Sequence, residues 1–146
     1  MLRSLSGLNA IITGGSRGIG KSIAIALARE GVNIAITSRN LDTLKETADE
    51  LKDFDVNIFY KDANIARKND VQKFIEDAHH ALGSIDIVIN NAGVMKNNPF
   101  LEVDEEEFDQ LFDTNVKGIY YVLQESLPYL VKQKSGDVIN IASMSG

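Results

Sequence analysis

Apolar residues in this chain fall into two patterns that alternate along its length. Short continuous runs at residues 8–13 (LNAIIT), 32–38 (VNIAITS), 56–60 (VNIFY), 85–90 (IDIVIN) and 138–142 (VINIA) predict buried strands. Between them, apolar residues recur every three or four positions, as in Ile19, Ile23 and Leu27, which predicts amphipathic helices. Strands that alternate with helices are typical of a parallel sheet, so the sequence predicts one doubly wound α/β domain over residues 1–146, with helices on both faces.

Helix boundaries can be placed from stop and start signals. Gly31 is expected to end the first helix, and further helices are expected at residues 41–52, 67–82 and about 115–132. In the segment VDEEEF, Asp104 is expected to cap a helix start, with Glu107 as its reciprocal partner. Pro128 is expected to bend the last long helix because it removes a backbone hydrogen bond.

Charge and composition exclude several function classes. The 15 basic and 21 acidic side chains give a net charge of −6, which argues against a nucleic-acid-binding surface. No apolar run approaches the roughly 20 residues of a membrane span, and the N-terminus is too polar for a secretory signal. The chain has no cysteine, and the adjacent His79 and His80 cannot both face one metal ion from a helix; both are expected to face solvent. We therefore expect a cytoplasmic domain without a metal site.

A glycine-rich stretch, TGGSRGIG at residues 13–20, lies between the first predicted strand and the first helix. Glycines let a phosphate approach the backbone closely, and the following helix start offers unpaired N–H groups. The spacing through Gly14, Gly18 and Gly20 is GxxxGxG, which differs from the general GxGxxG fingerprint, and no GK[ST] follows. The stretch predicts a phosphate cradle; the alternative is a tight turn without a ligand.

The second predicted strand ends in TSRN, which bears on the choice of cofactor. An acid near this point usually binds the ribose 2′-hydroxyl of NAD, whereas an arginine accommodates the 2′-phosphate of NADP. Here Ser38 and Arg39 stand in place of an acid, and Arg17 adds a second positive charge. NADP(H) is therefore favoured over NAD. Asp42 could reach the ribose instead, although it suits the start of the next helix better, and Arg39 could be an ordinary surface residue.

Four motifs occur in order: TGGSRGIG, NNAG at residues 90–93, TNVKG at residues 114–118, and a serine after the last strand. Together they resemble the short-chain dehydrogenase/reductase family, in particular its classical branch, and are similar to those of 3-oxoacyl-[acyl-carrier-protein] reductases. The resemblance runs from Leu8 to the end of the chain. It implies a Rossmann-type sheet, which here would stop after the fifth strand.

The resemblance also implies roles for single residues. The cofactor phosphates would be lined by Gly14, Ser16, Arg17, Gly18, Ile19 and Gly20. The adenine would be held by Asp62 and Ala63, while the central sheet and the nicotinamide ribose would be served by Asn90, Ala92 and Gly93. Asn115, at a local break in the long helix, would position a water, and Ser143 would hydrogen-bond the substrate carbonyl.

The family's proton donor, the tyrosine of a Tyr-x-x-x-Lys motif, lies downstream of that serine. None of the tyrosines Tyr60, Tyr120, Tyr121 and Tyr129 has a lysine four positions later. The resemblance implies that the parent protein is an NADP(H)-dependent carbonyl reductase. By the same resemblance, its leading substrates would be 3-oxoacyl thioesters carried by acyl carrier protein, and its assembly would be a homo-tetramer.

We expect the 146-residue chain alone to be inactive. The alternative is a cofactor-binding module without catalysis, or a half domain that needs a partner. In either case, residues 138–141 would form an open sheet edge. The apolar stripe of the long helix would also lack cover: Val116, Ile119, Leu123, Leu127 and Leu130.

Overall fold

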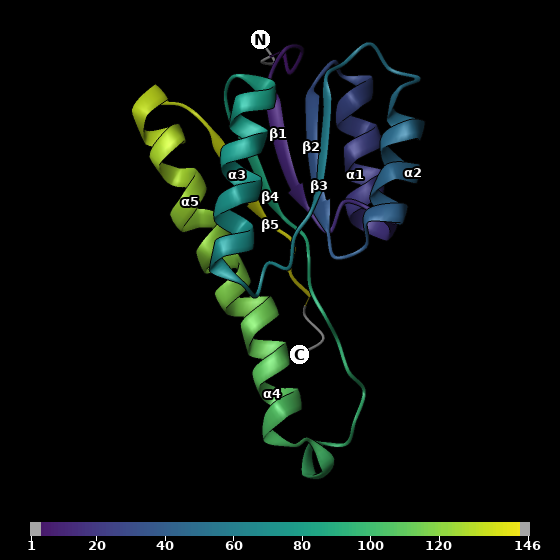
Figure 1. The fold of residues 1–146 in the computed structure, drawn as a ribbon, viewed down its shortest axis with the longest axis vertical. Helices are drawn as coiled ribbons and strands as arrows, with labels where there is room; N and C mark the ends of the chain where they lie inside the picture. The colour runs from purple at the N-terminus through teal and green to yellow at the C-terminus, as the bar shows by residue number, and fades with distance from the viewer. Residues whose placement is uncertain (1–3, 144–146) are drawn as a thin grey trace.

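A single parallel sheet forms the centre of the computed structural model, which describes residues 4–143 (Figure 1). Its strands are β1 (Asn9–Thr13), β2 (Asn33–Ser38), β3 (Ile58–Asp62), β4 (Ile87–Asn90) and β5 (Asp137–Asn140). They lie in the order β3-β2-β1-β4-β5, so the chain leaves β1 toward β2 and later returns to β1's other side at β4. Ligands of such sheets bind beyond the carboxyl ends of the strands, at this reversal.

Helices cover both faces of the sheet, as expected (Figure 1). Helices α1 (Gly18–Arg29) and α2 (Leu41–Leu51) pack on one face, and α3 (Lys68–Leu82) and α5 (Gly118–Gln133) pack on the other. Successive residues of β1 alternate between these two cores: Ala10 and Ile12 join the first, whereas Ile11 joins the second. Because both faces are buried, the strand reads as a continuous apolar run.

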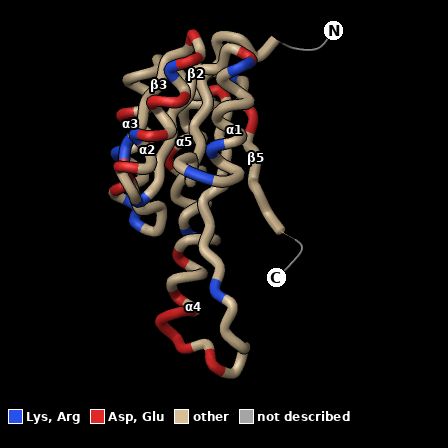
Figure 2. The backbone as a smooth tube through the Cα atoms, turned by 90° about the vertical axis from the view of Figure 1, so that its right-hand side faces the viewer, with Lys and Arg blue, Asp and Glu red and all other residues tan. Residues whose placement is uncertain are grey.

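One long helical rod extends beyond the carboxyl ends of the strands (Figure 1). It consists of α4 (Glu105–Phe112), a π-helical turn (Asp113–Lys117) and α5, so the helix expected from residue 115 is the second part of a longer one. A 3-10 turn (Phe100–Glu102) precedes it, and acidic residues gather at this tip (Figure 2). The Asp104 carboxylate accepts a hydrogen bond from the Glu107 N–H at 2.8 Å, which confirms the predicted cap. The Glu107 carboxylate does not complete a reciprocal pair but accepts from Asn98 Nδ2 at 2.6 Å.

The other helix boundaries agree with the sequence expectation to within two residues. Gly31, with φ of +78°, follows the end of α1 at Arg29, and α2 and α3 each differ from prediction by one residue. Pro128 lies inside α5, and the bend expected there stays a prediction.

Strand boundaries differ more. β3 lies two residues later than predicted, because its pairing with β2 runs from Ile34–Ile58 to Ser38–Asp62 and carries the strand into polar residues. β4 and β5 are shorter than their apolar runs, since Ile85 precedes the ladder and β5 pairs only through Asn140.

The apolar surfaces expected to lack cover are exposed in part. β5 is an edge strand on which Val138 and Ile139 are 40% and 45% exposed, in agreement with the prediction. Val116 and Leu127 are exposed too, but the expectation was wrong for Leu130, which is buried in the core between α3, α5 and the sheet. Within residues 4–143, no helix is both long enough and apolar enough to cross a bilayer.

Candidate functional site

A cavity of about 530 Å³ lies at the carboxyl ends of β1, β2 and β4. It is lined by most of the residues proposed from the sequence for cofactor binding: Gly14, Ser16, Arg17, Gly18, Ile19, Ser38, Arg39, Ala63, Ala92 and Gly93. Gly20, Asp62 and Asn90 lie outside this lining. The fold therefore gathers residues from four separate loops at the point where the strand order reverses.

The glycine-rich turn packs tightly against the loop after β4. Gly14 has φ of +66°, and a Cβ placed on it would lie 2.9 Å from the Ala92 Cα. A Cβ on Gly20 would lie 2.3 Å from the Gly14 carbonyl oxygen. Side chains would not fit at these two positions, so the backbone of the turn can lie close to the loop after β4.

A network of hydrogen bonds fixes the turn to the loop after β4. The buried Thr13 Oγ1 accepts from the Asn91 N–H at 3.1 Å and from the Ala92 N–H at 3.0 Å. In return, Asn91 Nδ2 donates to the Thr13 and Gly14 carbonyl oxygens at 3.1 and 3.2 Å. Sequence reasoning singled out neither Asn91 nor Thr13, although both stand within the motifs that it used.

Two arginines line the cavity: Arg17 comes from the glycine-rich turn, and Arg39 follows the end of β2. In the described part of the chain, neither Arg17 nor Arg39 has a carboxylate within ion-pair distance. None of the described residues that line the cavity carries a carboxylate. Asp42 lies in the first turn of α2, which Asn40 caps by accepting from the Thr43 N–H at 3.0 Å. The interpretation of Asp42 as a helix-start residue is therefore confirmed.

The loop after β3 forms the next part of the wall. Ala63 is buried and lines the cavity, whereas Asp62 is exposed. Asn64 and Ile65 also line the cavity and were not predicted from the sequence. The Asn64 N–H is held by the Asp70 carboxylate at 3.2 Å, so the first turn of α3 shapes this loop.

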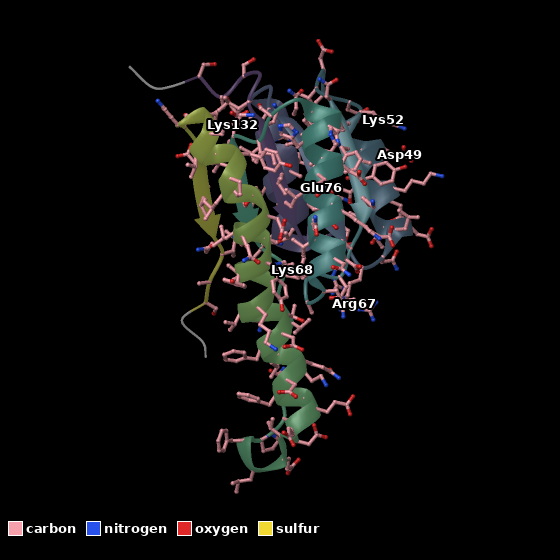
Figure 3. The ribbon with its side chains drawn as sticks, turned by 60° about the vertical axis from the view of Figure 1, so that its left-hand side comes forward. Asp49, Lys52, Arg67, Lys68, Glu76 and Lys132 are labelled. Carbon is pink, nitrogen blue, oxygen red and sulfur yellow. The ribbon has the colours of Figure 1, made fainter. Side chains whose placement is uncertain are left out.

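A second cleft, of about 450 Å³, adjoins the first. The two share Arg39, Asn64, Val94 and Thr114, and the second adds Lys96 and Arg67, which lies at the amino-terminal end of α3 (Figure 3). Among the described residues that line this second cleft, Asp113 is the one acid. Its carboxylate accepts a hydrogen bond from Lys117 Nζ at 2.6 Å, which raises the pKa of that lysine. Lys96 Nζ lies 4.0 Å from Glu107 Oε2, so of these two cations Arg67 is the one without a carboxylate partner among the described residues. The labelled Asp49 and Lys52 form a separate, exposed ion pair on α2, which lowers the pKa of Asp49 (Figure 3).

Asn115 lies in the π-helical turn and contacts the loop after β4. Its Oδ1 accepts from the Val94 N–H at 2.9 Å, and its Nδ2 donates to the Val94 carbonyl at 2.8 Å. Both ends of the side-chain amide are therefore committed to one backbone residue that lines the cavity.

Asn90 and Asn140 form a side-chain pair across β4 and β5. Asn90 Nδ2 donates to Asn140 Oδ1 at 2.9 Å, and the two residues are registered partners in the sheet. The Asn90 Oδ1 is buried and has no hydrogen-bond partner among the described residues. Ser143, three residues later, is exposed beyond the carboxyl end of β5, the same end of the sheet as the cavity.

The described residues contain no group of three or more histidine, aspartate or glutamate side chains placed to hold a metal ion. The expectation that both histidines face solvent was wrong for His79, which stacks on Tyr129 with ring centroids 4.3 Å apart. His80 is exposed.

Comparison with known proteins gives the chain its family. The family model described as short chain dehydrogenase matches residues 8–146. The chain belongs to this family. The short chain dehydrogenase fold explains the sheet order and confirms the doubly wound, Rossmann-type architecture expected from the sequence.

Among curated relatives, the chain is similar to a 3-oxoacyl-[acyl-carrier-protein] reductase of Staphylococcus epidermidis. The two are 38% identical over 139 residues, which make up 94% of this chain and 57% of the relative. The chain thus spans little more than half the length of that reductase.

Solved structures of similar proteins include examples with either cofactor type. An alcohol dehydrogenase from the archaeon Thermococcus sibiricus, complexed with 5-hydroxy-NADP, matches with a TM-score of 0.85 at 34% identity, covering 90% of this chain and 57% of that one. An NAD⁺-bound xylitol dehydrogenase matches with a TM-score of 0.94 at 26% identity, covering 99% and 56%. Membership in the short chain dehydrogenase family therefore leaves the choice between NADP and NAD to residues of this chain.

Proposed function

We propose that this chain is the cofactor-binding part of an NADP(H)-dependent oxidoreductase that interconverts a carbonyl and an alcohol. The observation that carries the proposal is the pair Arg17 and Arg39, which line a cavity whose described lining includes no carboxylate. A guanidinium group forms strong, often bidentate hydrogen bonds with phosphate. An NAD-type site would instead place an acid near the ribose hydroxyls.

The energetic effect of this pair can be bounded. A hydrogen bond to a charged group contributes roughly 1.5–3 kcal/mol, which corresponds to about a ten- to hundredfold preference for NADPH over NADH. Neither guanidinium is neutralised by an acid among the described residues, so the full charge is available to the 2′-phosphate.

The lining also suits the rest of such a cofactor. The crowded positions of Gly14 and Gly20 keep the turn's backbone within reach of phosphate groups. Ala63 and Asn64 provide a wall for the adenine, and Ala92 and Gly93 one for the nicotinamide ribose. Bound NADPH would supply the hydride.

Two residues are proposed for the chemistry itself. The Ser143 hydroxyl would donate a hydrogen bond to the substrate carbonyl oxygen and polarise it. The Asn115 amide already binds the Val94 backbone at both ends. Because the amide is already committed, a water at Asn115 would instead be held by a main-chain carbonyl oxygen of the π-helical turn. Such a turn departs from the regular helical hydrogen-bond pattern.

The substrate class follows by similarity only. The Staphylococcus epidermidis relative acts, as its name states, on 3-oxoacyl groups attached to acyl carrier protein. We propose the same class for the whole protein, together with a proton-donating tyrosine after Ser143 and a homo-tetrameric assembly. A cofactor-binding module without catalysis is the second candidate.

The test is a fluorescence titration of the 146-residue chain with NADPH and with NADH, for wild type and Arg39→Asp. Wild type should prefer NADPH, and Arg39→Asp should shift the ratio of the two dissociation constants toward NADH by about ten- to hundredfold. Arg29→Asp, which makes the same charge change at the far end of α1, is the control and should leave the ratio unchanged. An equal ratio in wild type and Arg39→Asp would reject the 2′-phosphate assignment.

A further inference from the structure

A buried hydroxyl lies directly behind the glycine-rich turn. Thr47, on α2, is 1% exposed, and its Oγ1 donates a hydrogen bond to the Ser16 carbonyl oxygen at 3.1 Å. The apolar stripe around it consists of Leu44, Ala48 and Leu51. A polar group buried among apolar side chains is costly unless it is hydrogen-bonded, so this bond holds the turn to α2.

The bond fixes more than one carbonyl oxygen. The peptide unit between Ser16 and Arg17 is planar and trans, so its C=O and N–H point in opposite directions. With the Ser16 oxygen held by Thr47, the Arg17 N–H is directed away from Thr47. Ser16 and Arg17 both line the cavity, and the Arg17 N–H makes no short, well-aligned hydrogen bond within residues 4–143.

A second anchor makes this orientation specific. On the other side of Ser16, the Gly15 N–H donates to the Thr37 carbonyl oxygen at 3.1 Å, so β2 holds one end of the turn while α2 holds the other. The Thr47 bond is the one that reaches the peptide unit leading into Arg17. If it were lost, this peptide could rotate and turn its carbonyl oxygen toward the cavity, where it would repel a phosphate.

We propose that Thr47 is a positioning residue for the phosphate groups of the dinucleotide. It holds the Ser16–Arg17 peptide so that the Arg17 N–H is presented to the pyrophosphate, which both cofactors share, before the anion binds. The inference rests on the proposed function, because it assumes that the cavity takes a dinucleotide. A purely structural Thr47 would support stability and leave cofactor affinity unchanged.

Thr47→Val and Thr47→Ser in the 146-residue chain separate these roles. Valine keeps the volume and removes the donor, and serine keeps the donor. The control is Ser126→Ala, which removes another buried hydroxyl that donates to a backbone carbonyl, that of Val122 at 2.6 Å, on the opposite face of the sheet. Dissociation constants for NADPH and NADH are measured together with urea unfolding.

Thr47→Val should weaken NADPH and NADH by the same factor of about five- to tenfold, the equivalent of one hydrogen bond, because both cofactors carry the pyrophosphate. Thr47→Ser keeps the hydroxyl donor, so its affinity for both cofactors should stay within about twofold of wild type. Ser126→Ala should change stability without changing affinity. Unchanged affinity in a folded Thr47→Val chain would overturn this inference alone. A folded wild-type chain that binds neither cofactor would overturn the proposed function and this inference with it.

A second measurement does not depend on a variant that folds. In amide NMR spectra of the wild-type chain, saturating NADPH should move the Arg17 amide proton downfield, as expected for an N–H that gains a phosphate acceptor. An Arg17 amide that stays in place while other lining amides shift would also overturn the proposal.

Discussion

Replacing Asn91 by aspartate tests whether the network between β1 and β4 holds the glycine-rich turn. The change keeps the side-chain shape but removes the two N–H donors that now bond the Thr13 and Gly14 carbonyl oxygens at 3.1 and 3.2 Å. Two lost hydrogen bonds amount to about 2 kcal/mol, and a carboxylate oxygen facing two carbonyl oxygens adds repulsion of about 1–2 kcal/mol. We expect Asn91→Asp to lower the free energy of unfolding by about 3–4 kcal/mol at pH 7.

Urea unfolding followed by circular dichroism measures this loss. The deficit should shrink as the pH falls, because a protonated aspartate regains one donor and loses its charge. Asn97→Asp is the matched control: Asn97 is exposed and its side chain makes no hydrogen bond with the described residues, so the change should stay within about 0.5 kcal/mol. A loss in Asn91→Asp no larger than that in Asn97→Asp would refute the reasoning.

Substitutions at two further positions test the crowding of the turn and the start of α4. Gly20→Ala should destabilise the chain by about 1–2 kcal/mol in urea and weaken NADPH binding. Its Cβ would lie 2.3 Å from the Gly14 carbonyl oxygen, a clash that outweighs alanine's helix preference of about 1 kcal/mol, and a stabilised variant would contradict this. Asp104→Ala should cost about 1 kcal/mol in the same assay, because it removes the bond to the Glu107 N–H at 2.8 Å. Asp104→Asn keeps a side-chain oxygen that can cap the helix, so it should retain most of that stability. If Asp104→Asn lost as much stability as Asp104→Ala, the effect would come from the negative charge rather than from the hydrogen bond.

The sheet could be predicted because its strands are buried on both faces. Helices on one face or the other bury residues of the central strands, such as Ile11 in β1, Ile36 in β2 and Val88 in β4. Each central strand is therefore a continuous apolar run, which does not show the spacing of three or four expected for a helix. The end of β3 could not be predicted, since its last residues, Lys61 and Asp62, are polar and join the ladder only through pairing with β2. Local hydrophobicity carries no information about that pairing.

The residues of the candidate site also fall into two groups, those that the sequence could place and those that it could not. Residues in a local motif, such as Gly14 and Arg39, could be placed at the cavity because the motif lies at the end of a strand. The sequence alone could not assign roles to Asn91 and Thr47, because their hydrogen-bond partners lie far away along the chain. The partners of Asn91 are 78 and 77 positions away, and the partner of Thr47 is 31 positions away. A signal for Thr47 was nevertheless present: it is a hydroxyl residue on the face of α2 that also carries Leu44 and Leu51. A polar residue on a buried helix face requires a partner, and the nearest loop is the place to look for it.

The π-helical turn shows why position and role are hard to separate at Asn115. Phe108, Phe112 and Val116 continue an uninterrupted spacing of four through the turn, so periodicity alone gives no sign of it. A π turn is less favourable than a regular helical turn, and the two bonds between Asn115 and Val94, at 2.8 and 2.9 Å, offset that cost. The same bonds hold the loop after β4, which lines the cavity. A loss of activity in an Asn115 variant of the whole protein would therefore be expected from the altered loop and helix, even if the amide took no direct part in the reaction.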